Sequence, residues 1–253
     1  MNHFSLIVTC YNLEKFIGEC LESLRDQNYP KELYEVIVAD DGSADASPDL
    51  IRKFEKENGF RVLAGPNQGL EKACNGAIRA AANEWIIRVD GDDFLDREYL
   101  KTVDAAMQSF PGFDFYYCKD YYEFYSETNK TLKKIPDFSP EEIFQRGDFF
   151  ATGTAYRKKD LEAVGLLPEA RKNCGLENYA VTLALLARGK KGMAVPKAIF
   201  YYRRHEANMS TLRRSQIINF GHELLAGYGR LFVTNEYHPY GLKLEAGSFH
   251  EKK

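Results

Sequence analysis

The sequence predicts an α/β fold in which a mostly parallel central sheet is flanked by helices on both faces. Short apolar runs alternate with segments of helical spacing through the first hundred residues, and the connections between them are short. This alternation is typical of strand–helix–strand units, which build parallel sheets covered on both sides. A chain of 253 residues, 44% of them hydrophobic, can also bury a core of the necessary size.

The elements of the first half follow from local patterns. Asn12 is a cap residue before a first helix whose apolar residues recur at helical spacing. Ser47 is expected to cap the second helix, with Pro48 at its first position and Gly59 at its end. An Ala-rich third helix covers residues 70–82. The four predicted buried strands are residues 4–9 (FSLIVT), 35–39 (EVIVA), 61–64 (RVLA) and 85–89 (WIIRV).

The second half has a different pattern, which indicates a change of architecture near residue 110 within one compact body. Residues 113–125 (FDFYYCKDYYEFY) are aromatic and typical of a strand. The other expected elements are a short helix opened by a capping box at 139–142, helices at 177–188 and 216–232, and a strand at 198–202.

Composition and charge exclude several classes of protein. Lys and Arg number 34 and Asp and Glu 37, so the net charge of −3 gives no general attraction to nucleic acid. Five widely spaced cysteines, without a C-x-x-C pair, form neither a zinc cluster nor a disulfide framework. The N-terminus lacks a basic signal-peptide region, and no apolar run reaches the roughly 20 residues that span a bilayer. We therefore expect a cytoplasmic protein without a transmembrane segment.

Polar clusters follow three of the predicted strands. Ligands of parallel sheets bind at the carboxyl ends of the strands, so we expect these clusters to converge. Asp90 and Asp92 offer hard oxygen ligands that suit Mg²⁺ or Mn²⁺, and Gly91 between them allows close approach of the backbone. A surface acidic turn is the alternative. The clusters are Thr9 to Asn12, Asp40-Asp41 and Asp90 to Asp93.

Two residues of the other clusters suit a nucleotide. Asp40 either accepts hydrogen bonds from a base or ribose, or opens a turn. Tyr11 either stacks on a base or packs at the strand end. No G-x-G-x-x-G follows the first strand, which disfavours a dinucleotide-dependent oxidoreductase.

These motifs, taken in order, resemble the N-terminal signature of family 2 glycosyltransferases. The resemblance covers residues 4 to about 100 well and continues more loosely to about 210. It implies a GT-A-like fold, with a donor half at 1–105, an acceptor and catalytic half at 106–215, and a C-terminal helix and tail at 216–253, all in one compact domain. The matching segments are SLIVTCYN at 5–12, EVIVADDGSAD at 35–45, NQG at 67–69, NG at 75–76 and DGDD at 90–93.

The resemblance also implies roles for particular residues. Asp92 would bind the divalent cation, Mn²⁺ or Mg²⁺, that bridges the diphosphate, and His205 would lie near the diphosphate or that cation. His205, Arg203 and Arg204 could also be a solvated basic stretch, although guanidinium groups suit diphosphate oxygens. The residues assigned to the nucleotide-diphospho-sugar donor are Thr9, Tyr11, Asp40, Asn67, Asp90, Gly91, Arg203 and Arg204.

The catalytic base is where this chain departs from the family pattern. The family presents Glu-Asp at the start of the helix after the acceptor loop, and its second acid commonly acts as the base. Here the pair is Glu177-Asn178, and an amide takes no proton at neutral pH. We interpret Glu177 as the base, with Asp148 or another acid as the alternative. Without any base, the chain would be a module that binds sugar nucleotides without turnover.

The resulting hypothesis is a metal-dependent inverting glycosyltransferase. It would move a sugar from a nucleotide-diphospho-sugar, with UDP favoured, to a hydroxyl of a saccharide or lipid-linked acceptor in polysaccharide or glycolipid synthesis. The aromatic residues of 113–125 either line the acceptor site or form a strand-pair core, which we favour. Lys130, Lys133 and Lys134 are expected to be a solvated face, or a peripheral contact with anionic lipids at the inner face of the membrane. A nucleotidyltransferase is disfavoured because its glycine-rich N-terminal loop is absent.

Overall fold

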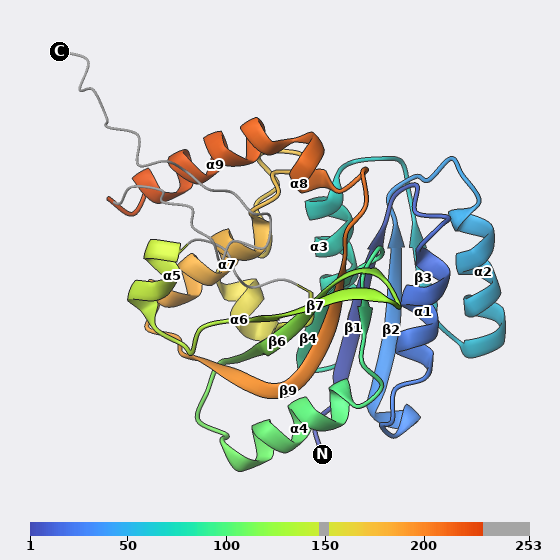
Figure 1. The fold of residues 1–253 in the computed structure, drawn as a ribbon, viewed down its shortest axis with the longest axis horizontal. Coiled ribbons are helices and arrows are strands. Elements are labelled where there is room, and N and C mark those ends of the chain that lie inside the picture. Colours follow the sequence, from blue (N-terminus) through green and yellow to red (C-terminus); the bar gives the residue numbers. More distant parts are fainter. Residues whose placement is uncertain (147–151, 230–253) are drawn as a thin grey trace.

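The computed structural model describes residues 1–146 and 152–229, and its elements are labelled in Figure 1. Strands and helices alternate through the first half, as the sequence predicts. In chain order they are β1 (Phe4–Cys10), α1 (Ile17–Arg25), η1 (Lys31–Leu33), β2 (Tyr34–Asp40), α2 (Ser47–Asn58), β3 (Arg61–Ala64), α3 (Leu70–Ala80), β4 (Trp85–Asp90), β5 (Phe94–Leu95) and α4 (Tyr99–Ser109). The second half adds β6 (Phe115–Ser126), β7 (Asn129–Lys134), α5 (Pro140–Arg146), β8 (Ala155–Arg157), α6 (Lys158–Ala163), α7 (Glu177–Leu186), β9 (Gly192–Arg203), α8 (Met209–Leu212) and α9 (Arg214–Ala226).

The described strands form a single mixed sheet. Its order is β3-β2-β1-β4-β8-β6-β9-β5, and β7 pairs with the outer part of β6. The first four strands in this order are parallel, which confirms the prediction for the N-terminal half. β8 runs antiparallel to both β4 and β6, and so joins the second half of the chain to the first.

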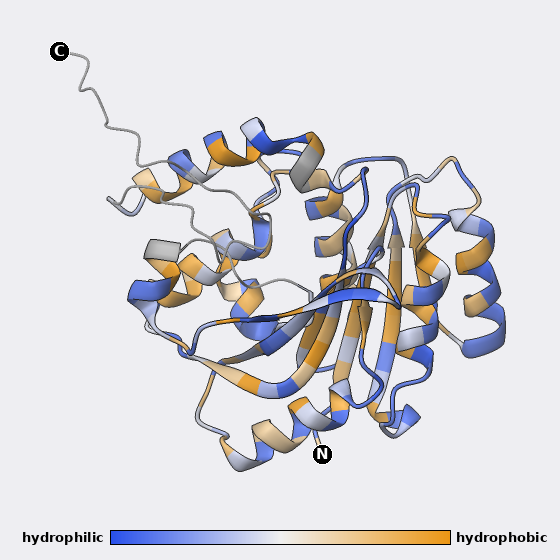
Figure 2. Ribbon diagram, in the orientation of Figure 1, coloured by the Kyte–Doolittle hydropathy of each residue, from blue (hydrophilic) through white to orange (hydrophobic). Residues whose placement is uncertain are grey.

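Helices cover both faces of this sheet. The path β1–β2–β3 steps one way across the sheet and the connection through α3 to β4 steps back, so right-handed crossovers place α3 opposite α1 and α2. Figure 1 shows α3 on the far side of the strands from α1 and α2. Apolar residues concentrate on the strands between these layers, as Figure 2 shows. All seven residues of β1 are buried, in keeping with a central strand.

Two predicted helix caps are wrong. Asn12 has a left-handed φ of 55° and its side chain accepts a hydrogen bond from Ala44 N at 2.8 Å, five residues before α1 begins. Ser47 is the first residue of α2, and its hydroxyl accepts from Leu13 N at 2.9 Å instead of capping its own helix. Both side chains join the loop after β1 to the loop after β2. The predicted stop at Gly59 is correct, since this residue takes φ 69° at the end of α2.

The aromatic segment forms the long strand β6, and most of its rings are core residues. Phe115, Tyr116 and Tyr117 are almost completely buried, whereas Tyr125 is 54% exposed. All residues of β7, including its three lysines, are exposed, as expected for a solvated face. The capping box is present in part, because Ser139 Oγ lies 3.4 Å from Glu142 N. Within the residues that the structure describes, none of the helices combines the length and the apolarity that a membrane span requires.

Candidate active site

Two cavities open at the carboxyl ends of the parallel strands. The first, which we call the β2–β3 cavity, measures about 380 Å³ and is lined by the ends of β2 and β3 and by α3. The second, the β1–β4 cavity, measures about 320 Å³ and is lined by the ends of β1 and β4, the start of α7, Tyr202 and residues between 207 and 217. Asp41 lines both cavities, so they adjoin. Volumes of this size are typical of small-molecule sites.

Arg88 and Asp90 project from the same face of β4, because side chains alternate along a strand. Arg88 is 8% exposed, and its Nη2 donates a hydrogen bond to the Asp90 carboxylate. Its Nη1 donates to Glu177 Oε1 at 2.7 Å and to Asn178 Oδ1 at 3.2 Å. Burial lowers the pKa of Arg88, but Asp90 and Glu177 raise it, with a net result well above its ordinary value. A charged guanidinium therefore connects β4 to the start of α7.

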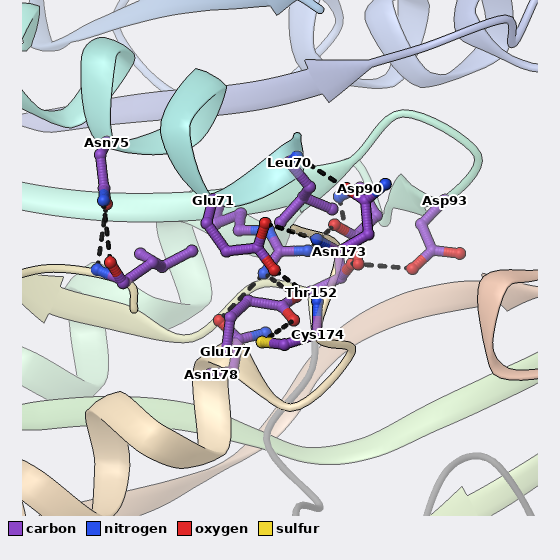
Figure 3. Close-up of polar contacts among 12 residues, drawn as sticks. Leu70, Glu71, Asn75, Asp90, Asp93, Thr152, Asn173, Cys174, Glu177 and Asn178 are labelled. Carbon is purple, nitrogen blue, oxygen red and sulfur yellow. Dashed lines mark hydrogen bonds and ion pairs between the residues drawn. The ribbon is translucent and has the colours of Figure 1, made fainter. Parts of the chain in front are cut away.

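The segment before α7 is held by Glu71, a buried residue of α3 (Figure 3). The Glu71 carboxylate accepts hydrogen bonds from Asn173 N at 2.8 Å and from Cys174 N at 2.6 Å. Gly175 takes φ 74°, and a Cβ there would lie 2.6 Å from an α9 side chain. Glu177 follows as the first residue of α7, 3% exposed, with its Oε2 3.9 Å from Cys174 Sγ. These contacts fix the position of the Glu177 carboxylate.

Ligand atoms of Glu71, Cys174 and Glu177 lie within 4.8 Å of one another, a spacing that metal sites share. Their electron pairs are already engaged, however. Two backbone amides bind Glu71, and Arg88 binds Glu177. Burial also raises the pKa of Cys174 far above its ordinary value, which keeps its thiol protonated. We interpret this group as structural.

Asp92 lines the β1–β4 cavity and contacts His205, which is not among the residues of the cavity wall. His205 Nε2 lies 3.0 Å from Asp92 Oδ2, and the imidazole stacks on Phe16 at a centroid distance of 4.4 Å. Nδ1 of His205 is buried and has no hydrogen-bond partner among the described residues. A carboxylate oxygen suits Mg²⁺ and Mn²⁺, and an imidazole nitrogen favours the transition metal. The pair therefore fits a divalent cation.

The charge around this turn also favours a cation. Burial raises the pKa of Asp93 well above its ordinary value, and Asp92 and Asp90 raise it further. Asp93 accepts hydrogen bonds from Arg203 N at 2.9 Å and from the Thr152 hydroxyl at 2.7 Å. Within the described ranges, neither Asp92 nor Asp93 has an ion pair with Lys or Arg. The acids of this turn are thus only partly balanced, and a bound cation would offset the repulsion that raises the pKa of Asp93.

Gly91 joins the ends of β1 and β4. Its N–H donates to Thr9 O at 3.2 Å, and a Cβ built on it would lie only 2.7 Å from the same oxygen. The sequence predicted that this glycine allows a close backbone approach. The structure gives a specific neighbour for that approach, which is the backbone of β1.

The predicted nucleotide-binding residues divide between the two cavities. Thr9, 6% exposed, and Tyr11, 48% exposed, line the β1–β4 cavity. Asp40 is buried at the end of β2 and lines the β2–β3 cavity, where its Oδ1 accepts from Ser43 N at 3.1 Å. This hydrogen bond shows that Asp40 opens a turn, as one interpretation predicted. Asp40 also lines a cavity, which is compatible with the predicted contact to a ligand.

Asp41 organises the loop that leads into α3. Its carboxylate accepts hydrogen bonds from Gln68 N at 2.7 Å and from Gly69 N at 2.9 Å. Asn67 lies in the same loop, where its carbonyl accepts from Lys172 Nζ at 3.0 Å. Asn67 lies beside the β2–β3 cavity but is not among the residues that line it.

The structure does not bring Arg203 and Arg204 to either cavity. Arg203 pairs with Glu19, donates through Nε to Asp92 O at 2.8 Å, and lies over three phenylalanine rings at 5.1–5.3 Å. Arg204 pairs with Glu123 on β6. Their position gives no support to the predicted diphosphate contact, because carboxylates on neighbouring elements hold both guanidinium groups. Asp148, the alternative base, lies outside the described residues.

Sequence reasoning missed several residues that contribute to this site. Arg88 and Arg213 line the β1–β4 cavity, and Thr152 bonds to both Asp90 and Asp93. The signal for Arg88 was available, since a charged residue inside the apolar run WIIRV requires a buried partner. The other two come close to the cavity only through the fold.

Comparisons with known proteins identify the family of the chain. Residues 5–165 match the family model described as glycosyl transferase family 2. The chain is 40% identical over 107 residues to the poly(ribitol-phosphate) β-N-acetylglucosaminyltransferase TarS of Staphylococcus aureus, a match that covers 42% of this chain and 19% of the relative. It is 26% identical over 222 residues to the minor teichoic acid biosynthesis protein GgaA of Bacillus subtilis, covering 84% of this chain and 49% of the relative. The chain therefore spans half or less of the length of these relatives.

Solved structures share the fold. TarS residues 1–349 in complex with UDP-GlcNAc superimpose with a TM-score of 0.66 at 21% identity, covering 88% of this chain and 66% of that one. The mannosyltransferase PcManGT of Pyrobaculum calidifontis, in complex with GDP-Man and Mn²⁺, gives a TM-score of 0.67 at 18% identity, covering 93% and 66%. These neighbours confirm the predicted GT-A fold.

Proposed function

The chain belongs to glycosyl transferase family 2, and we propose that it is a metal-dependent inverting transferase that moves a sugar from a UDP-sugar to an acceptor hydroxyl. The observation that carries the proposal is the β1–β4 cavity, whose wall includes Asp90, Asp92 and Glu177. A donor-binding acid, a cation-binding acid and a base candidate thus line one small-molecule cavity. The acceptor would be a saccharide or lipid-linked glycan, because the named relatives are a poly(ribitol-phosphate) glycosyltransferase and a teichoic acid biosynthesis protein.

The two adjoining cavities together have room for a nucleotide-diphospho-sugar. The base would occupy the β2–β3 cavity, where the Asp40 carboxylate accepts a hydrogen bond from an N–H of the base. The ribose and diphosphate would pass Asp41 into the β1–β4 cavity. Tyr11 offers an exposed ring face for stacking, and Arg213 supplies a positive charge for phosphate oxygens.

Asp92 and His205 would hold the Mn²⁺ or Mg²⁺ ion, since their donor atoms already face each other at 3.0 Å. A divalent cation in such a site neutralises the negative charge that develops on a diphosphate leaving group. The partly balanced acids of this turn supply the attraction for it.

Glu177 would act as the general base. Arg88 occupies its Oε1, whereas Oε2 accepts only a long contact from the Cys174 thiol at 3.9 Å, so Oε2 would accept the proton of the acceptor hydroxyl. The deprotonated oxygen attacks the anomeric carbon from the face opposite the nucleotide, so the configuration inverts. The amide of Asn178 takes no part in this proton transfer.

The second candidate function is a sugar-nucleotide-binding module without turnover. Two observations favour it: Asn178 replaces the second acid of the family pattern, and an arginine already binds the remaining carboxylate. Nucleotide binding would be the same in both cases, so only a measurement of turnover separates the two functions.

The test begins with thermal-shift screening of UDP-sugars and GDP-mannose in the presence of Mn²⁺, since a ligand of the folded state raises the melting temperature. Slow hydrolysis of the stabilising donor is then measured for the wild type, for Asp92→Asn and for Glu177→Gln. We expect Asp92→Asn to lose metal-dependent turnover and Glu177→Gln to bind the donor without turnover. Asp49→Asn, on the exposed surface of α2, is the matched control. Binding without hydrolysis in the wild type would support the module instead.

A further inference from the structure

Arg88 is a buried charged residue that contacts the candidate base. It lies inside an apolar strand, is 8% exposed, and lines the same cavity as Glu177. A buried charge is tolerated only when it is paired and hydrogen-bonded, so its partners determine what it does.

The guanidinium of Arg88 binds residues on two sides of the site, the end of β4 and the start of α7. On one side, Nη2 binds Asp90, the acid that the donor would contact. On the other, Nη1 binds Glu177 Oε1 at 2.7 Å and Asn178 Oδ1 at 3.2 Å. Nε is buried without a partner among the described residues, so no ligand reaches it. Because carboxylates occupy both ends of its fork, Arg88 is not available to bind an anionic substrate.

We propose that Arg88 is a positioning residue that fixes the Glu177 carboxylate relative to Asp90, with Oε1 held and Oε2 presented to the acceptor. The inference rests on the proposed transfer reaction. A planar guanidinium holds both partners at once because its donors form a rigid fork, which an ammonium group lacks. The distance between base and donor would then be set by one side chain.

The same geometry gives Asn178 a role. Its Oδ1 shares the Nη1 donor with Glu177, and as a neutral amide it adds no second negative charge there. A carboxylate at position 178 would bring a second negative charge to Nη1 and compete with Glu177 for the charge of the guanidinium. Arg88 and Asn178 therefore act together, and the amide keeps Glu177 as the charged partner of Nη1.

The test uses the full chain with the donor that stabilises it and compares Arg88→Met, Arg88→Lys and Asn178→Asp with the wild type. Arg61→Met is the matched control, since Arg61 also forms an ion pair with a carboxylate, Glu35 at 2.9 Å, but is not among the residues that line either cavity. For each variant we measure kcat, donor KM, UDP affinity and the melting temperature. Rates are expressed per folded protein.

Arg88→Met is expected to lower kcat about 100-fold and to change donor KM and UDP affinity less than about tenfold, because a displaced catalytic group mainly affects turnover. Arg88→Lys should recover about tenfold of the lost kcat, since an ammonium group still pairs with Glu177. Arg61→Met should keep kcat within about threefold. A kcat for folded Arg88→Met within about threefold of wild type would overturn the inference.

If Arg88→Met does not fold, Asn178→Asp tests the inference instead, because aspartate still offers an acceptor oxygen to the buried Arg88 guanidinium. We expect it to lower kcat about tenfold while UDP affinity stays within about threefold. A higher kcat would place the base at position 178 and overturn the inference. If the wild type itself transfers no sugar, the proposed function fails and this inference with it. If the wild type is active and the variants match it, only the inference fails.

Discussion

Replacing Gly91 with alanine tests whether the ends of β1 and β4 set the geometry of the site. A Cβ at this position would lie 2.7 Å from Thr9 O and 2.9 Å from Leu13 Cδ1. The first distance is about 0.7 Å shorter than an ordinary contact. The neighbour is a backbone oxygen of a central, fully buried strand, so it cannot rotate away as a flexible side chain would.

The expected destabilisation follows from that overlap. Overpacking in a buried site costs about 1–3 kcal/mol, and contact with backbone places Gly91→Ala in the upper half of this range. For a chain of this size, about 2 kcal/mol corresponds to a fall in melting temperature of about 4–8 °C. Because Asp90 and Asp92 flank Gly91, a shift of the turn by even part of an ångström should also lower kcat about 100-fold.

The assay combines thermal melts followed by circular dichroism with donor turnover in the presence of Mn²⁺. Gly18→Ala is the matched control, since a Cβ on Gly18 has no atom within 4 Å and the residue lies in α1. Alanine there should raise stability by about 0.5–1 kcal/mol, because it reduces the entropy of the unfolded chain. A melting temperature of Gly91→Ala equal to that of the wild type, with unchanged turnover, would refute the reasoning.

Three further changes have defined outcomes. Burial raises the pKa of Glu35, but hydrogen bonds from Ser5, Ala82 N and Arg61 bring this pKa below its ordinary value of 4.5. The Glu35 carboxylate therefore stabilises the fold above pH 4.5, and this stabilisation is lost on acidification. Glu35→Gln should therefore cost about 1 kcal/mol at pH 7, and melts should show that this difference shrinks below about pH 4; a constant difference would contradict it. Tyr11→Ala should weaken UDP binding about five- to hundredfold in calorimetry, as loss of a stacked base requires, while the ligand-free melting temperature stays unchanged. Glu71→Gln should cost about 2–3 kcal/mol in denaturant titrations, because one of two buried amide N–H groups loses its acceptor; a wild-type midpoint would argue against this role.

The sequence was sufficient for the strands of the first half and for the turn that ends β4. Their signals are local, since buried parallel strands are continuous apolar runs and their ends are marked by polar residues. The positions of Thr9, Asp90 and Asp92 around one cavity followed from the expectation that parallel strands end at one edge. Topology alone predicts that convergence.

The sequence could not predict contacts between side chains and partners that lie far apart in the chain. Asn12 and Ser47 have the chemistry of helix caps, but backbone N–H groups of another loop bind them instead. Arg203 has the chemistry of a phosphate ligand, but aromatic rings and Glu19 hold it away from the cavities. The contact between Arg88 and Glu177 joins residues 89 positions apart, and no local pattern indicates that they meet.

The continuous sheet limits how the residues before and after about position 105 can be separated. β4 pairs with β8 through Trp85–Arg157, Ile86–Tyr156 and Ile87–Ala155, while β5 pairs with β9. A fragment ending near residue 105 would leave β4 with an unpaired edge and β5 without its only partner strand among the described residues, which invites aggregation. Recombination that exchanges acceptor halves between relatives must therefore preserve strand register across this seam. Specificity is more safely exchanged in the loops than at the boundary between the halves.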